Sequence, residues 1–182
     1  MKNIAIIAFL ILTSFSANAE NGAELWAFGG KAVSNSIKDT KSSAWGVYQE
    51  TQTNWGRWDL GYLNEGHQGG VCNLKSCYND KRDGIFALYE MQYKLNDSFR
   101  SSFAIGPYFS STTITDPNRV NYRDAYRTDL LGKTSLKYSI NSKIDTELSW
   151  WHVIYSTNDL LINGRASRGD ADIFSIGVAY KF

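Results

Sequence analysis

Large apolar residues alternate with small or polar residues over positions 172–182. The apolar members of this series are Phe174, Ile176, Val178, Tyr180 and Phe182. Successive side chains of a β-strand point to opposite faces. The alternation therefore predicts a strand with one continuous apolar face, which ends the sequence on an aromatic residue.

Eight segments of the chain have this strand character. They cover residues 24–32, 43–51, 55–63, 84–95, 99–110, 126–140, 144–155 and 172–182. Short breaks of the composition expected for hairpin turns lie at residues 52–54, 96–98 and 141–143. Long polar breaks lie at residues 33–42, 64–83, 111–125 and 156–171.

The alternation of short and long breaks is typical of a transmembrane β-barrel, with its turns in the periplasm and its loops outside the cell. An even number of strands returns both termini to the same side. We therefore predict an all-β fold, an eight-stranded antiparallel transmembrane β-barrel. A soluble sandwich or lipocalin-like barrel is the alternative, and it would bury its aromatic side chains inside.

Aromatic residues gather near the ends of the predicted strands. Rings with a polar edge favour the boundary between lipid and water. We interpret these residues as two interfacial girdles, formed by Trp26, Phe28, Trp45, Trp55, Trp58, Tyr62, Tyr108, Tyr138, Trp150, Trp151 and Tyr155.

The polar faces of the predicted strands carry charged residues. An eight-stranded barrel is filled by its own side chains, and an unpaired buried charge is costly. Inward acids and bases should therefore form a plug of ion pairs, with a proton or ion path as the alternative. The candidates are Asp59, Glu90, Asp129, Asp145 and Glu147 as acids, and Lys94, Arg100, Lys133, Lys137 and Lys181 as bases.

The first residues have the regions of a secretory signal peptide. Lys2 precedes an apolar run, and Ala17 and Ala19 are small residues of the kind that signal peptidase accepts. We expect residues 1–19 to be removed and residues 20–182 to form one barrel domain in the outer membrane of a Gram-negative bacterium. A net charge of +1 gives no reason to expect a nucleic-acid partner, and no motif calls for a cofactor.

Two cysteines, Cys72 and Cys77, lie in the second long break. An even pair in an exported chain predicts a disulfide. No further cysteine or histidine stands at metal-ligand spacing, so we expect no metal site there.

The same break is flanked by two polar clusters. One contains Glu65 and His67, and the other contains Arg82 and Asp83. Because the two strands are hairpin neighbours, Glu65 could pair with Arg82 and His67 with Asp83. The clusters would then either cap a long loop or bind a lipopolysaccharide headgroup or sugar, since arginine matches phosphate.

A third cluster lies in the last predicted hairpin. If Glu147 faces inward, then His152, Ser156 and Asp172 face outward near the outer leaflet. A histidine, a serine and an acid on one patch can form a base, a nucleophile and an orienting group. Arg165 and Arg168, in the loop above, would suit a phosphorylated lipid.

The chain resembles small eight-stranded outer-membrane barrels over its mature length, on the evidence of its last strand and its rhythm of turns and loops. Within that group it distantly resembles the lipid A 3-O-deacylases, which place a His-x-Ser motif on the seventh strand. The resemblance implies His152 as the base, Ser156 as the nucleophile and Asp170 or Asp172 as the acid. Here Ile154 occupies the expected serine position, so Ser156 lies about 13 Å from His152 on a regular strand unless a bulge intervenes.

Three functions follow as alternatives. The first is a monomeric barrel with an envelope-structural or lipopolysaccharide-interacting role. The second is a lipid A deacylase of the serine-hydrolase type, and the third is a narrow solute channel. In each case we expect the barrel assembly machinery to recognise the last strand, which ends at Phe182.

Overall fold

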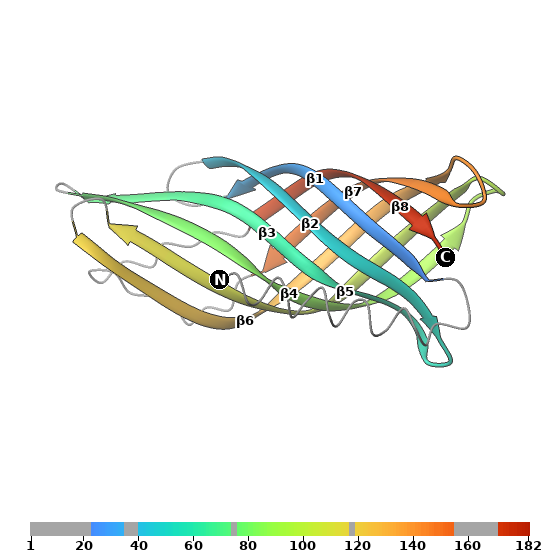
Figure 1. Cartoon of the computed structure of the whole chain (residues 1–182), viewed down its shortest axis with the longest axis horizontal. Helices are drawn as coiled ribbons and strands as arrows, with labels where there is room; N and C mark the ends of the chain where they lie inside the picture. Colours follow the sequence, from blue (N-terminus) through green and yellow to red (C-terminus); the bar gives the residue numbers. More distant parts are fainter. Residues whose placement is uncertain (1–22, 35–39, 74–75, 117–118, 155–170) are drawn as a thin grey trace.

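The computed structural model describes residues 23–34, 40–73, 76–116, 119–154 and 171–182. Each strand pairs antiparallel with its neighbour in the sequence, and the last strand pairs with the first to close a barrel (Figure 1). This arrangement confirms the predicted fold class. The eight strands are β1 (Glu24–Ser34), β2 (Thr40–Thr53), β3 (Gly56–Asn73), β4 (Ser76–Lys94), β5 (Phe99–Asp116), β6 (Arg119–Ser139), β7 (Ile144–Ile154) and β8 (Ala171–Lys181). The part of the chain that the structure describes contains no helix long and apolar enough to cross a membrane.

Strands β3 to β6 extend well beyond the predicted limits. The hairpin of β3 and β4 continues to the pair Asn73 and Ser76, and that of β5 and β6 continues to Asp116 and Arg119. Residues 64–83 and 111–125 are thus almost entirely strand, and their prediction as loops was wrong. These extensions carry mostly polar residues at successive positions, so they lack the apolar alternation by which a half-buried strand is recognised.

The barrel has two distinct ends. The short turns lie at one end together with the two ends of the described barrel, where the Phe182 amide donates to the Ala23 carbonyl at 3.2 Å. We call this the turn end and the opposite one the loop end. Asn96 and Asn141 fix two of the turns, since each side-chain oxygen accepts from backbone amides two and three residues later. The predicted turns at residues 96–98 and 141–143 are confirmed, and the turn predicted at residues 52–54 lies at residues 54–55.

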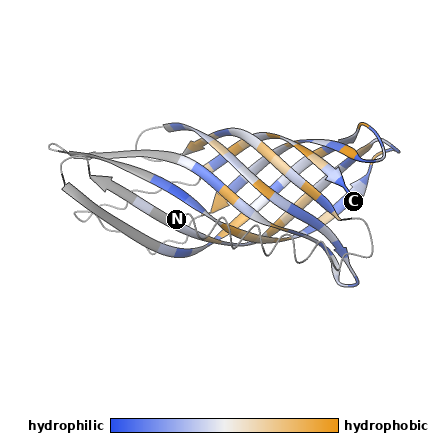
Figure 2. Cartoon of the chain, viewed as in Figure 1, coloured by the Kyte–Doolittle hydropathy of each residue, from blue (hydrophilic) through white to orange (hydrophobic). Residues whose placement is uncertain are grey.

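The outer face of the barrel carries a broad apolar band. Figure 2 shows apolar residues on neighbouring strands, with hydrophilic residues at the turn end. The outward series of β8 includes Phe174, Ile176, Val178 and Tyr180, all exposed, as the alternation predicts. Exposed aromatic and aliphatic side chains on this scale need a lipid or protein partner.

Several of the aromatic residues fill the barrel interior instead. Trp26, Phe28, Tyr108 and Trp151 are buried, and Phe28 stacks on Trp151 with ring centroids 4.8 Å apart. Their assignment to interfacial girdles was wrong. The physical reason is the two-residue period, since Trp151 lies four positions from the inward Glu147 and must share its face.

The other aromatic residues predicted for the girdles lie on the outer face, in a turn or outside the described residues. Trp45 contacts Tyr62 on the outer face of β2 and β3, and Trp150 and Tyr138 are exposed. Trp58 contacts the exposed Tyr89, while Trp55 is exposed in a turn. Tyr155 and the predicted signal peptide, residues 1–19, lie outside the described residues.

Candidate functional site

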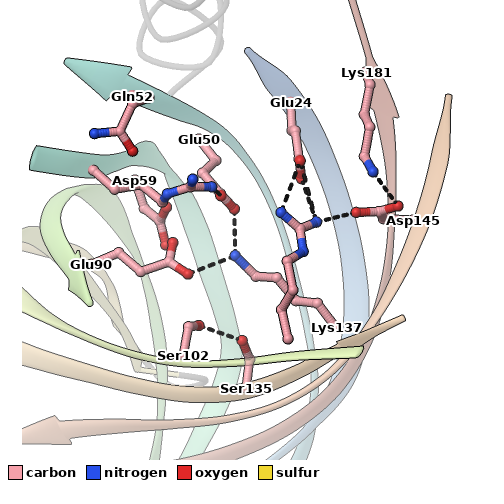
Figure 3. A network of polar contacts seen from close by, with 12 residues as sticks. Glu24, Glu50, Gln52, Asp59, Glu90, Ser102, Ser135, Lys137, Asp145 and Lys181 are labelled. Atoms are coloured by element: carbon pink, nitrogen blue, oxygen red, sulfur yellow. Dashed lines mark hydrogen bonds and ion pairs between the residues drawn. The ribbon is translucent and has the colours of Figure 1, made fainter. Parts of the chain in front are cut away.

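The lumen at the turn end is filled by three groups of ion pairs, to which every strand contributes. In the Lys137 group, Lys137 donates to Glu90 at 2.7 Å and to Glu50, which also pairs with Arg57 (Figure 3). The Lys137 group therefore sets two carboxylates against two cations.

The Arg100 group lies beside it. Arg100 pairs with Glu24 at 3.3 Å and with Asp145, and the other oxygen of Asp145 lies 2.7 Å from Nζ of Lys181 (Figure 3). This group also balances two carboxylates with two cations.

The Lys133 group is different. Nζ of Lys133 lies 2.5 Å from Asp59 and 3.6 Å from Glu147, so one ammonium serves two carboxylates. The ammonium also donates to the Tyr48 hydroxyl at 3.1 Å and lies over its ring. All four side chains are buried.

These groups confirm the predicted plug of ion pairs for most of the candidates. Asp129 is also buried and accepts from Ser110 at 2.9 Å. Lys94 is an exception, because it is exposed and pairs with Asp97 in a turn. It follows the inward alternation of Glu90 but is the last residue of β4, so its long side chain reaches water.

Three members of the plug were missed from the sequence, namely Glu24, Glu50 and Arg57. The alternation contained the signal that could have found them. Glu24 shares the face of Trp26, and Glu50 shares that of Tyr48. The interpretation of Trp26 as a girdle residue places its face outside and hides Glu24, whereas Tyr48 was given no face, so the inward position of Glu50 was missed.

The two polar clusters between β3 and β4 are brought together as predicted. Glu65 and Arg82 are both buried in the lumen, with Nη1 and Oε2 3.9 Å apart. Asp83 lies on the opposite face, where it accepts from the Tyr62 hydroxyl at 2.8 Å. The ladder places His67 opposite Lys81, but the His67 side chain lies outside the described residues.

Cys72 and Cys77 are direct partners in the ladder of β3 and β4. Opposed residues of an antiparallel pair have Cα atoms about 4.5–5.5 Å apart, a separation that a disulfide can bridge. The two side chains lie outside the described residues, so the disulfide stays a prediction.

His152 and Asp172 meet on the outer face of the barrel. They are direct partners in the ladder of β7 and β8, and Nδ1 of His152 lies 2.8 Å from Oδ1 of Asp172. The same oxygen accepts from Nε1 of Trp150 at 2.9 Å. Their predicted placement on one outward face is confirmed. Ser156, Arg165, Arg168 and Asp170 lie outside the described residues.

Two lysines near this pair were not singled out from the sequence. Lys31 of β1 and Lys41 of β2 are exposed on the outer face near the loop end. Lys31 is the ladder partner of Phe174, and Lys41 is opposite Val33, whose partner on β8 is Asp172. Within the described residues neither lysine has an ion-pair partner.

The polar residues on the outer face near the loop end form one surface patch. The outer faces of β7, β8, β1 and β2, which are consecutive around the barrel, carry polar groups beside exposed tryptophans. We call this the rim patch, which consists of Trp150, His152, Asp172, Lys31, Lys41 and Trp45.

Comparison with known proteins shows the fold. No protein-family model and no curated protein matches the sequence. Among solved structures, the chain is similar to the Neisserial surface protein A, with a TM-score of 0.61 and 13% identity over 88% of this chain and 96% of that one. It is similar to Ail of Yersinia pestis in complex with sucrose octasulfate, with a TM-score of 0.58 and 9% identity over 88% and 98%. It is also similar to the N-terminal barrel of Pseudomonas aeruginosa OprF, with a TM-score of 0.54 and 14% identity over 89% and 98%.

Proposed function

We propose that this protein is an outer-membrane barrel that binds phosphorylated lipid headgroups, those of lipopolysaccharide, at the outer leaflet. The rim patch is the observation that carries this proposal. Lys31 and Lys41 project outward without ion-pair partners among the described residues, and Trp45 and Trp150 flank them. Tryptophan favours the headgroup level of a membrane, and an ammonium at that level attracts phosphate.

The apolar outer face supports the membrane location. Among the described residues, its exposed large apolar side chains come from seven of the eight strands of the closed barrel, all but β3, as expected of a lipid-facing surface. The exposed Phe182 directly follows Lys181, the last residue of β8, and we expect the assembly machinery to recognise this strand. We expect the barrel to act as a monomer. In the closed part of the barrel every strand is paired on both sides, so no strand edge is left there to pair with another copy.

The filled lumen favours a function on the outer surface over a solute channel. Ion pairs occupy the turn end, and the packed rings of Trp26, Phe28, Tyr48 and Trp151 lie next to them. Passage of a solute would require these buried side chains to separate, at the cost of desolvated, unpaired charges.

Lipid binding can be tested with charge-matched double variants. The variant Lys31→Gln with Lys41→Gln removes the two rim cations, and Lys94→Gln with Lys143→Gln removes two exposed cations at the turn end. Binding of purified lipid A to the folded protein in phospholipid nanodiscs is measured at low and high salt. We expect the rim variant to bind roughly tenfold more weakly, with a smaller salt dependence, and the turn variant to bind like wild type. Equal loss in both variants, or no loss in either, would contradict the proposal.

A second candidate function is hydrolysis of a lipid ester at the same patch. The contact of His152 with Asp172 favours it, because an acid bound to Nδ1 of a histidine fixes the tautomer whose Nε2 can take a proton. Ser156 follows Ile154, the last residue of β7, by two positions. It would supply the nucleophile for attack on the ester carbonyl.

The hydrolase candidate is tested by the acylation of lipid A. Wild type, Ser156→Ala, His152→Ala and Asp172→Asn are expressed in a Gram-negative host, and extracted lipid A is examined by mass spectrometry. Loss of one acyl chain only with wild type would support a hydrolase with Ser156 as its nucleophile. Unchanged lipid A from all four strains, with each barrel folded, would exclude lipid A deacylation.

A further inference from the structure

The Lys133 group has one negative charge more than its cation can balance. Asp59 and Glu147 both approach Nζ of Lys133, whereas the Lys137 and Arg100 groups each pair two carboxylates with two cations. A net charge buried in a barrel lumen is costly. The imbalance therefore requires either a bound cation or a proton on one of the carboxyl groups.

The carboxyl group of Asp59 also lies beside that of Glu90, which belongs to the Lys137 group. Carboxylate oxygens of Glu50, Asp59 and Glu90 lie within 4.8 Å of one another, and Figure 3 shows the ends of the Asp59 and Glu90 side chains side by side. Oδ1 of Asp59 and Oε2 of Glu90 are buried and receive no hydrogen bond from the described residues. Two buried carboxyl groups at such a distance cannot both ionise without strong repulsion, and a proton on one provides the missing donor.

A proton fits this position better than a metal ion. The other oxygens of the three carboxyl groups already bind cationic side chains, those of Lys133, Lys137 and Arg57. These three positive groups would repel a metal cation. A proton supplies the single positive charge needed to balance the second carboxylate of the Lys133 group.

The hydrogen bonds identify Asp59 as the group that carries the proton. The Tyr48 hydroxyl donates to Glu147 at 2.9 Å, which stabilises Glu147 as a carboxylate. Glu90 accepts from Lys137 at 2.7 Å, within a group that is already balanced. Among the described residues, Asp59 accepts a hydrogen bond only from the shared ammonium of Lys133.

We propose that Asp59 is protonated in the folded barrel at neutral pH and donates its proton to Oε2 of Glu90. This proton makes the turn-end plug electrically neutral. The charged and titratable groups that surround it come from every strand: Glu24 of β1, Tyr48 and Glu50 of β2, Arg57 of β3, Glu90 of β4, Arg100 of β5, Lys133 and Lys137 of β6, Asp145 and Glu147 of β7, and Lys181 of β8.

Infrared spectroscopy tests the proposal on the folded protein in detergent micelles at about pH 7, where an exposed aspartate is ionised. We expect wild type to show the carbonyl stretch of a protonated carboxylic acid, with a shift in heavy water. Asp59→Asn should lose this band and stay folded, because an amide can donate to Glu90 and accept from Lys133. The matched control is Asp145→Asn, which alters a buried aspartate held by two cations and should retain the band.

Absence of the band from wild type, or its full retention in Asp59→Asn, would overturn the proposal. A wild-type band that appears only after a chelator is added, and is lost again with calcium, would show that the site holds a metal cation instead. If Asp59→Asn does not fold, the protonation of Asp59 is tested by carbon NMR of wild type with labelled aspartate side chains. We expect a single aspartate resonance with the chemical shift of a protonated acid. A spectrum with only carboxylate shifts would refute the assignment.

Discussion

His152 and Asp172 form a hydrogen bond between neighbouring strands on the outer face of the barrel, with Nδ1 and Oδ1 2.8 Å apart. Both side chains are partly exposed, and Trp150 donates to the same carboxylate oxygen. The carboxylate thus has two donors from β7, and it fixes the imidazole ring beside the tryptophan.

This contact predicts the tautomer of His152. A carboxylate at Nδ1 favours the proton on that nitrogen and leaves Nε2 as an acceptor. Nitrogen NMR of the neutral imidazole should show a protonated Nδ1 in wild type, and Asp172→Asn should weaken this preference. Trp150→Phe removes only the indole donor and should preserve it. The same tautomer mixture in wild type and Asp172→Asn would refute the prediction.

The buried charges predict which lysines stabilise the barrel. Lys137→Met leaves Glu50 and Glu90 buried without their shared cation, so the free energy of unfolding should fall by about 3–5 kcal/mol. Lys94→Met removes only the exposed pair with Asp97 and should leave the free energy of unfolding almost unchanged, because water screens an exposed pair. Urea-induced unfolding in lipid vesicles measures both. Similar values for the two variants would show that the plug is not held by Lys137.

The two-residue period accounts for how much of this fold the sequence reveals. It identified the eight strands, the turn end and most of the charges that the lumen buries. It could not distinguish the two faces where both carry aromatic residues, as for Trp150 outside and Trp151 inside. In a narrow barrel, aromatic rings are needed both to fill the lumen and to face the lipid, so hydrophobicity alone does not assign them.

The outer part of the candidate site was harder to predict for a different reason. The pair of His152 and Asp172 followed from strand parity. Lys31 and Lys41 joined them only through closure of the barrel, which sets β8 beside β1. Contacts between residues at the two ends of the sequence depend on register, and no local pattern records that register.

A turn predicts a measurable pH effect. The hydrogen bond from Lys94 lowers the pKa of the exposed Asp97 carboxyl below its ordinary value, and the nearby charge of Lys94 adds to the effect. The contribution of this pair to stability is therefore present above the ordinary aspartate pKa and is lost as the pH falls through the lowered value. In Lys94→Met the Asp97 pKa should rise toward the ordinary value, as followed by NMR titration. An unchanged titration would show that the pair does not form in solution.

Two adjacent glycines predict opposite responses to the same substitution. A Cβ added at Gly30, which faces the lumen, would lie 2.0 Å from the carbonyl oxygen of Phe174. Added at Gly29, which faces outward, it would meet no atom within 4 Å. Gly30→Ala must therefore separate the backbones of β1 and β8, the two strands whose pairing closes the barrel. Gly29→Ala introduces no clash in the folded barrel and reduces the conformational freedom of the unfolded chain. We expect Gly30→Ala to lower the free energy of unfolding by roughly 1–3 kcal/mol, as overpacking does, and Gly29→Ala to leave it unchanged or slightly raised. Urea unfolding in vesicles and the heat-dependent shift in gel mobility measure both, and equal stability of the two variants would contradict the register of β1 with β8.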